Sequence, residues 1–530
     1  SAAFEEEGFI FVFQDVRGKS MSEGKFVNMR PQDAYQRGKK ATDDATDTYD
    51  TIEWLVEHLP QNNGRVGMWG TSYPGYYTSV GAINSHPALK AISPQAPIAD
   101  WFFDDFHRNG AFVTPMAFIF FDSFDKQLDG PQAHREKGMD AITPDGYEFF
   151  KALGPLSNVN KHYFYGERPF WNELTEHPNY DAYWQARNVL QHLGKTKPAT
   201  LVVGGWYDTE DLYGPLATYQ TMSNQNSKSH VKMVMGPWSH GQWNQGKGEK
   251  LGEADFGFNT STWFQENILL PFFQQHLKEG DDAKLASATM FETGSNRWRK
   301  FETWPPAKTK ETRLYLGADE SLNSTRQDAG FSDYISDPNK PVPHSANISR
   351  GWDKPYMVED QRFSARCPDV LVFESQAQEE DITLAGSLEL DLWFSTSQSA
   401  ADIVVKLVDV FPGKDVNDDK VDKETGNRHE LVRWGVIRGR FRDSFSEPKP
   451  FKPNQPSRVK FELYDVLHTI KRGHKLQIQI QSSMFPFIDI NPQKYVENIF
   501  EATAADFVKA EHRIYHSKQY PSAISFNTIN

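Results

Sequence analysis

The sequence predicts an α/β domain followed by an all-β domain, and a change of pattern along the chain supports this prediction. Up to about residue 270, short apolar runs alternate with segments of helical period, which is typical of a sheet with helices on its faces. From about residue 312 onward, apolar and polar residues alternate with period two, as in residues 388–395 and 476–481. Such strands recur with almost no helical pattern between them, so we expect a β-sandwich of the jelly-roll type.

Individual helices and strands of the first domain can be predicted from short stretches of the sequence. Residues 9–13 are five apolar residues in succession, so we expect a strand with both faces buried. Residues 47–59 form a predicted helix, because their apolar side chains fall on one stripe, and residues 60–64 end it with proline, asparagine and glycine. The other predicted elements are a strand over residues 65–69, a helix over 76–84, and strands over 91–94, 199–204 and 231–235.

Roughly a hundred residues separate two of these strands, where a strand–helix unit needs about thirty. The excess, residues 101–190, is rich in aromatic residues. We interpret it as a mostly helical cap over the carboxyl edge of the sheet, where open α/β sheets place their sites. A helical subdomain with its own core is the simpler alternative, and we expect most of these aromatic residues to be core.

The predicted domains follow from these patterns. The α/β domain covers residues 1–100 and 191–280, the helical cap covers 101–190, and the β-sandwich covers 281–530. We expect the strands that would begin such a sheet to be absent from this sequence.

Composition excludes several kinds of partner. The 530 residues carry a formal net charge of −14, which argues against nucleic acid, because phosphate binding needs a basic face. The sequence contains no apolar run of about 18 residues, so we predict no membrane span. Its one cysteine, Cys367, cannot form a disulfide within the chain.

Ser72 lies in a stretch, GTSYPG, that almost fits the G-x-S-x-G motif of a serine nucleophile. A strand precedes it and a helix follows, with Gly70 and Gly75 permitting a sharp turn and Pro74 suiting the first turn of the helix. The amide of Tyr73, at the start of that helix, can point at an oxyanion. On this evidence alone, a structural serine in a glycine-rich turn remains the alternative.

A serine nucleophile needs a base, and the base needs an acid that orients it. In a doubly wound sheet the partners follow later strands in the order Ser, Asp, His. Asp208 and His240 stand just past two such strands. Either residue alone could be a solvated loop residue, but three suitable residue types in the expected order favour a catalytic triad.

Several segments together identify a resemblance to the α-amino-acid ester hydrolases, in the superfamily of cocaine esterase and the X-prolyl dipeptidyl peptidases. They are QDVRGKSMSEG from Gln14, GTSYPG around Ser72, GGWYD ending at Asp208, GPWSHG around His240, and GHKLQIQIQSSMFPFIDINPQ from Gly473. The resemblance covers nearly the whole chain. It implies an α/β-hydrolase domain with an inserted helical cap and a C-terminal jelly roll, and in this family the late glycine of the elbow is normal.

The resemblance also implies a cluster of three acidic residues that receives the α-ammonium group of the substrate. Glu210 and Asp211 follow the triad aspartate, and Asp105 is the second residue of the paired-aspartate motif at the start of the cap. Crowded carboxylates repel one another, and a bound ammonium relieves that repulsion. Without the resemblance, acidic residues in the first turn of a helix would be the simpler interpretation of Glu210 and Asp211.

The resemblance implies a serine hydrolase and acyltransferase that needs no metal or organic cofactor. It would act on an α-amino-acid ester and pass the acyl group to water or to an amine nucleophile. It further implies an upstream segment with a tyrosine that completes the oxyanion hole, a possible homo-oligomer, and export to the periplasm or the exterior. We cannot place that tyrosine in this sequence.

Other functions remain open at this stage. The protein could be an X-prolyl dipeptidyl peptidase or a general carboxylesterase of the same superfamily. The all-β domain could bind carbohydrate beside an inactive α/β domain. The acidic cluster could hold calcium, whereas residues 415–419 only mimic the opening of an EF-hand loop, since they lack its glycine and its closing glutamate.

Overall fold

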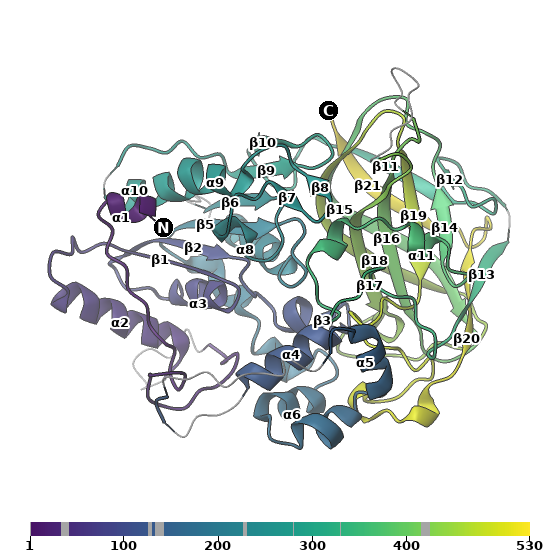
Figure 1. Ribbon diagram of the computed structural model, residues 1–530, viewed down its shortest axis with the longest axis horizontal. Coiled ribbons are helices and arrows are strands. Elements are labelled where there is room, and N and C mark those ends of the chain that lie inside the picture. Colours follow the sequence, from purple (N-terminus) through teal and green to yellow (C-terminus); the bar gives the residue numbers. More distant parts are fainter. Residues whose placement is uncertain are drawn as a thin grey trace.

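The computed structural model describes residues 2–32, 42–125, 130–132, 143–225, 231–278, 280–328, 330–414 and 425–530. It has an α/β part at the left of Figure 1 and an all-β part at the right, with a group of helices below their junction. Each part forms from the stretch of sequence that carries the matching pattern. The predicted fold class is therefore confirmed.

One six-stranded sheet forms the centre of the α/β part. Its strands, in spatial order, are β1 (Val66–Thr71), β2 (Leu89–Gln95), β5 (Ala199–Gly205), β6 (Val231–Gly236), β9 (Ala288–Glu292) and β10 (Arg297–Phe301). All neighbours are parallel except β10, which runs antiparallel to β9. The carboxyl ends of β1, β5 and β6 therefore meet at one edge of the sheet.

Helices cover both faces of this sheet (Figure 1). They are α1 (Ala2–Glu6), α9 (Thr260–Phe264) and α10 (Leu270–Leu277) on one face, and α2 (Asp44–His58), α3 (Tyr73–Gly81) and α8 (Tyr213–Gln225) on the other. Along β5, Leu201 and Val203 pack in the core of the first face while Val202 packs in the core of the second. No helix in the described ranges has the length and apolar character that a bilayer span needs.

The strand predicted over residues 9–13 does not form, and this prediction was wrong. Phe9 and Phe11 pack on Phe4 of α1, with ring centroids 5.1 Å and 6.4 Å away, but Phe13 is 92% exposed. The segment pairs with none of the described strands. A strand must share backbone hydrogen bonds with a neighbouring strand. An apolar run can instead be held in place by the packing of its side chains, without forming a strand.

The first sheet also extends past residue 281, where we expected the β-sandwich to begin. All five residues of β9 are buried, and the strand pairs in parallel with β6. A short apolar run of this kind has the same pattern in a buried parallel strand as in the core of a sandwich. Only the neighbouring strand with which it pairs shows which of these two structures the run forms.

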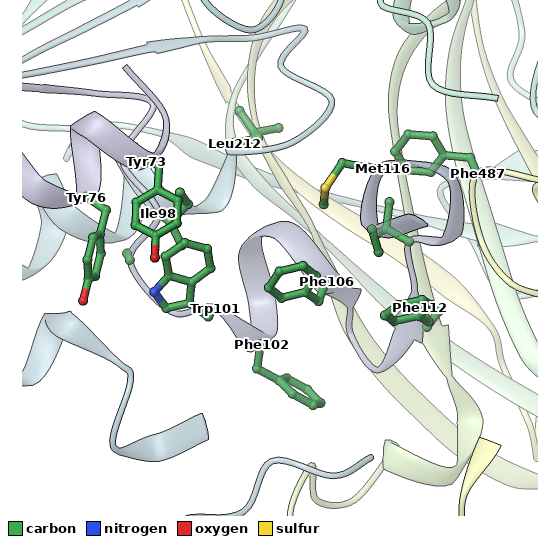
Figure 2. Close-up of a cluster of buried hydrophobic side chains, with 14 of the residues drawn as sticks. Tyr73, Tyr76, Ile98, Trp101, Phe102, Phe106, Phe112, Met116, Leu212 and Phe487 are labelled. Carbon is green, nitrogen blue, oxygen red and sulfur yellow. The ribbon is translucent and has the colours of Figure 1, made fainter. Parts of the chain in front are cut away.

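The chain leaves the sheet between β2 and β5 and forms mostly helices, in the stretch predicted to be a cap. The elements are a π-helical turn (Phe102–Phe106), β3 (His107–Arg108), β4 (Ala111–Phe112), α4 (Thr114–Phe124), α5 (Gly146–Leu153), α6 (Pro169–Glu176) and α7 (Ala182–Gln185). Figure 2 shows Trp101, Phe106 and Phe112 in one buried cluster with Tyr73 of α3 and Phe487 of the all-β part. The aromatic residues thus form a core that joins the three parts.

Two antiparallel sheets form the all-β part. The larger contains β12 (Leu322–Asn323), β11 (Lys310–Leu316), β21 (Ala523–Ile529), β15 (Ile382–Thr396), β20 (Ala510–Tyr515), β13 (Phe331–Ser336) and β18 (Ser457–Ile470); the smaller contains β14 (Leu371–Glu374), β19 (Lys475–Gln481), β16 (Asp402–Val410) and β17 (His429–Arg438). Leu388 and Leu390 of β15 share a core with Ile478 and Ile480 of β19. The apolar residues of the period-two pattern therefore face inward, as predicted.

Candidate active site

Ser72 lies in the sharp turn between β1 and α3. Its backbone has φ 67° and ψ −127°, which residues other than glycine rarely adopt. A Cβ at Gly70 would lie 2.5 Å from backbone atoms of Pro74, and a Cβ at Gly75 would lie 2.5 Å from the carbonyl oxygen of Gln95. The stretch GTSYPG therefore has the strained backbone and close packing of a nucleophile elbow, with the second glycine one position late.

Tyr73 presents its amide, rather than its phenol, to this turn. It is the first residue of α3, so its N–H is one of the donors that have no acceptor within the helix. The phenol donates to Asn28 Oδ1 at 2.6 Å and accepts from the amide of Met29 at 2.7 Å. Burial raises the pKa of this phenol. The amide is therefore the group of Tyr73 that could stabilise an oxyanion.

Asp208 and His240 follow β5 and β6, and their side chains meet. His240 Nδ1 lies 2.8 Å from Asp208 Oδ2 and 3.1 Å from Oδ1. Burial by itself would raise the pKa of Asp208, but the adjacent His240 lowers it below its usual value. Burial would lower the pKa of His240, but the negative charges of Asp208 and Glu210 prevail and raise it to about 9.

The hydroxyl of Ser72 lies in the same site but makes its hydrogen bond to a carboxylate. It donates to Asp211 Oδ2 at 3.4 Å, and this oxygen is also 3.8 Å from His240 Nδ1. His240 Nε2 faces Glu210 Oε2 at 3.6 Å. No hydrogen bond in the described part of the chain joins Ser72 to His240. The three predicted triad residues converge, but the serine–histidine contact is not formed in this conformation.

The predicted acidic cluster assembles around the same imidazole. Asp208 Oδ1 accepts the amides of Glu210 at 2.9 Å and Asp211 at 3.0 Å, and this folds the loop so that both side chains lie beside His240. Burial raises the pKa of Glu210 to about 7. It also raises the pKa of Asp105 and of Asp211, and the charge of Asp105 raises that of Asp211 further. Asp211 Oδ1 is buried and has no partner among the described residues.

The two members of the paired-aspartate motif have different environments. Asp104 Oδ2 accepts the amides of Ala99 at 2.7 Å and Asp100 at 3.0 Å, so its side chain secures the start of the cap. Asp105, on the same π-helical turn, lies beside Asp211, and His240 and Arg108 are the cations near it. Asp105 is therefore the member of the pair that faces the site, as the resemblance implied.

Two cations near the site were not identified from the sequence. Arg108 Nη2 donates to the carbonyl oxygens of Thr209 at 3.1 Å and Glu210 at 2.5 Å, so it ties β3 to the loop that follows β5. Lys354 Nζ, from the loop between β13 and β14, donates to the carbonyl oxygen of His240 at 2.7 Å. The position of Arg108, three residues after Asp105, is a usable sequence signal, whereas Lys354 comes from a distant part of the chain and carries none.

The cluster also has the donor set of a cation site. Glu210, Asp211 and His240 each offer one atom, and these atoms lie within 4.8 Å of one another. Carboxylate oxygens and an imidazole nitrogen suit a divalent metal, and the carboxylates equally suit an ammonium group. Residues 415–419, which mimic an EF-hand loop, lie outside the described residues.

Comparisons with known proteins agree with this architecture. Residues 1–242 match the X-Pro dipeptidyl-peptidase (S15) family, and residues 281–525 match the C-terminal non-catalytic domain of X-Pro dipeptidyl-peptidase. Cocaine esterase of Rhodococcus sp. (strain MB1 Bresler) is 25% identical over 546 residues, which cover 98% of this chain and 88% of the esterase.

Two solved structures superpose over 99% of this chain and 86% of their own. One is an α-amino acid ester hydrolase, with a TM-score of 0.92 and 37% identity. The other is an aminopeptidase from a marine sediment Thaumarchaeota archaeon, with a TM-score of 0.93 and 33% identity. The chain therefore belongs to the X-Pro dipeptidyl-peptidase (S15) family of hydrolases, within the superfamily that includes cocaine esterase and α-amino acid ester hydrolase.

Proposed function

We propose that this protein is a serine hydrolase and acyltransferase that acts on α-amino-acid esters with a free amino group. The observation that carries the proposal is the convergence of Asp105, Glu210 and Asp211 on the Asp208–His240 pair. One of these carboxylates lies 3.4 Å from the hydroxyl of Ser72. A cation bound by this cluster would therefore lie directly beside the candidate nucleophile.

The amino group supplies that cation. Burial raises the pKa values of Glu210 and Asp211, and the negative charges of neighbouring carboxylates, Asp105 and Asp208 among them, raise both further. A protonated amine that lies between these groups is therefore bound and also relieves the repulsion. An N-acylated substrate brings no positive charge. Its amide group would be buried against ionised carboxylate oxygens with no charge to compensate them. Selection for the free amine follows from these electrostatics.

The reaction proceeds in two acyl-transfer steps. His240 takes the proton of Ser72, Ser72 Oγ attacks the ester carbonyl, and the amide of Tyr73 stabilises the tetrahedral oxyanion. His240 then gives its proton to the departing alcohol, which leaves an aminoacyl group on Ser72. Water or an amine attacks this intermediate, so the products are an amino acid or a new amide. Asp208 orients the imidazole throughout.

An aminopeptidase is the second candidate. The similarity to an archaeal aminopeptidase favours it, and a peptide with a free amino terminus would place its ammonium on the same carboxylates. The two functions differ only in the leaving group, which is an amine in place of an alcohol. Comparing alanine methyl ester with alanyl-alanine amide as substrates separates them, because an aminopeptidase cleaves the amide at a comparable kcat/KM.

The decisive experiment compares alanine methyl ester with its N-acetyl analogue in the wild type and in Asp105→Asn. We expect the wild type to favour the free amine by roughly 10- to 100-fold in kcat/KM, because a charge-assisted contact contributes about 1.5–3 kcal/mol. Asp105→Asn should lose most of this preference, while Asp281→Asn, which removes an exposed aspartate, should keep it. Equal rates on both esters in the wild type would contradict the proposal.

A further inference from the structure

The carboxylates of the cluster occupy the contacts that the catalytic pair should make with each other. Ser72 Oγ donates to Asp211 Oδ2 at 3.4 Å, and His240 Nε2 lies 3.6 Å from Glu210 Oε2. Because Asp208 holds Nδ1 at 2.8 Å, Nε2 is the only nitrogen left to accept the serine proton. In this state it faces a carboxylate instead of the hydroxyl.

A carboxylate beside Nε2 favours the imidazolium, which cannot act as a base. The negative charges of Asp208 and Glu210 overcome the effect of burial and raise the pKa of His240 to about 9. About one imidazole in a hundred is then neutral at pH 7. The charged groups that act on His240 come from three segments. They are Asp208, Glu210 and Asp211 after β5, Asp105 on the π-helical turn, and Lys354 between β13 and β14. Arg108 on β3 lies near Asp105 and binds the carbonyl oxygen of Glu210.

We propose that Glu210 and Asp211 hold the catalytic pair in unproductive contacts until the ammonium group of a substrate binds these carboxylates and releases the pair. The inference rests on the proposed function, since it requires that the cluster bind an ammonium. It adds that the amine is needed for the rate of acylation as well as for affinity. The cluster therefore acts as a gate on Ser72.

Binding of the ammonium group replaces the contacts that Ser72 and His240 make with the two carboxylates. The ammonium donates N–H groups to Asp211 Oδ2 and Glu210 Oε2, so Ser72 loses its acceptor and Nε2 loses its carboxylate neighbour. The imidazolium then gives its Nε2 proton to solvent, because the added positive charge opposes it. The hydroxyl turns to the neutral Nε2, and that nitrogen accepts the serine proton when Oγ attacks.

The test uses a reaction of Ser72 that needs no amine and has no deacylation step. An uncharged alkyl fluorophosphonate is attacked by Oγ, so that an oxygen–phosphorus bond forms, fluoride leaves and the serine proton passes to His240. We measure its second-order rate constant at pH 7 against increasing methylammonium, at constant ionic strength. Tetramethylammonium, which has no N–H donor, is the matched control.

Methylammonium should accelerate the labelling of Ser72 about 10- to 100-fold and saturably, which is the range that the neutral fraction of His240 allows. Tetramethylammonium should leave the rate unchanged. Glu210→Gln should react faster than the wild type without any amine and should gain less from methylammonium. Glu249→Gln, which removes an exposed glutamate after His240, should behave as the wild type.

Two results would overturn the gate in distinguishable ways. Methylammonium could compete with alanine methyl ester and yet leave the labelling rate unchanged or lower it; the ammonium site would then stand and the gate would be refuted. If methylammonium does not compete with alanine methyl ester at any concentration, the ammonium site itself is refuted, and the proposed function fails together with the gate.

Discussion

Replacing Arg108 by methionine should damage the amine site more than it damages the rest of the enzyme. Its guanidinium donates to the carbonyl oxygens of Thr209 at 3.1 Å and Glu210 at 2.5 Å. Each charge-assisted hydrogen bond contributes about 1.5–3 kcal/mol, so the loss of both should lower the free energy of unfolding by about 3–6 kcal/mol. The loop that carries Glu210 would also lose its tie to β3.

The catalytic effect of Arg108→Met follows from the same contacts. Burial raises the pKa of Asp105, and the positive charge of Arg108 opposes this shift. Without that charge the cluster is less ionised, and one carboxylate on the loop is displaced. We expect kcat/KM for alanine methyl ester to fall roughly 10- to 100-fold, which corresponds to about 1.4–2.8 kcal/mol. The N-acetyl ester, which makes no ammonium contact, should lose much less.

Steady-state kinetics on both esters, together with thermal unfolding, test this prediction. Arg108→Lys should be intermediate, because lysine keeps the positive charge but places its ammonium on a side chain of different length and shape from the guanidinium whose Nη2 donates to both carbonyls. Arg366→Met removes an exposed arginine and serves as the matched control. A native-like melting temperature and native kcat/KM in Arg108→Met would show that Arg108 does not hold the loop after β5 in place. An equal loss on both esters would reduce Arg108 to a purely structural role.

Four further perturbations have defined outcomes. Ser72→Ala should lower turnover by about 10⁴-fold or more at an unchanged melting temperature, and near-native turnover would rule Ser72 out as the nucleophile. Gly75→Ala should lower the melting temperature by several degrees, since the new Cβ would lie 2.5 Å from the carbonyl oxygen of Gln95. An unchanged melting temperature and activity would show that the turn tolerates a side chain at this position. Burial raises the pKa of Glu210 from 4.5 to about 7, so ionising this carboxyl lowers the stability of the folded protein as the pH rises from 4.5 to 7. Glu210→Gln should therefore have a higher melting temperature than the wild type at pH 8, and this gain should vanish near pH 4.5. A lower melting temperature of the variant at pH 8 would contradict this prediction. EDTA should leave the turnover of alanine methyl ester unchanged, and a loss of turnover that calcium restores would instead support a metal between Glu210, Asp211 and His240.

Local sequence pattern predicted where the three candidate triad residues stand. A strand that ends in a tight turn places Ser72, Asp208 and His240 at one edge of the sheet, and this follows from periodicity and from glycine. The acidic cluster was found through resemblance alone. Nothing in the spacing of Asp105 and Glu210 shows that a π-helical turn brings the first to the loop of the second.

What the sequence did not predict depends on pairing across long distances. The apolar run over residues 9–13 is anchored by side chains and pairs with none of the described strands, and β9 joins the first sheet although its pattern also suits a sandwich. Lys354 reaches the carbonyl oxygen of His240 from 114 residues away. The contact between Ser72 and Asp211 depends on a rotatable hydroxyl, which no sequence pattern specifies.

The proposed function requires that Ser72 carry the acyl group of an amino-acid ester in a site where the acidic cluster meets the Asp208–His240 pair. Mass spectrometry of enzyme quenched with acid during turnover of alanine methyl ester would detect this acyl-enzyme. We expect an adduct with the mass of one alanyl group on the peptide that contains Ser72. With N-acetylalanine methyl ester under the same conditions, the corresponding N-acetylalanyl adduct should be a minor species at most. Steady turnover of alanine methyl ester with no adduct, or with the adduct on another residue, would show that Ser72 is not the residue that carries the acyl group.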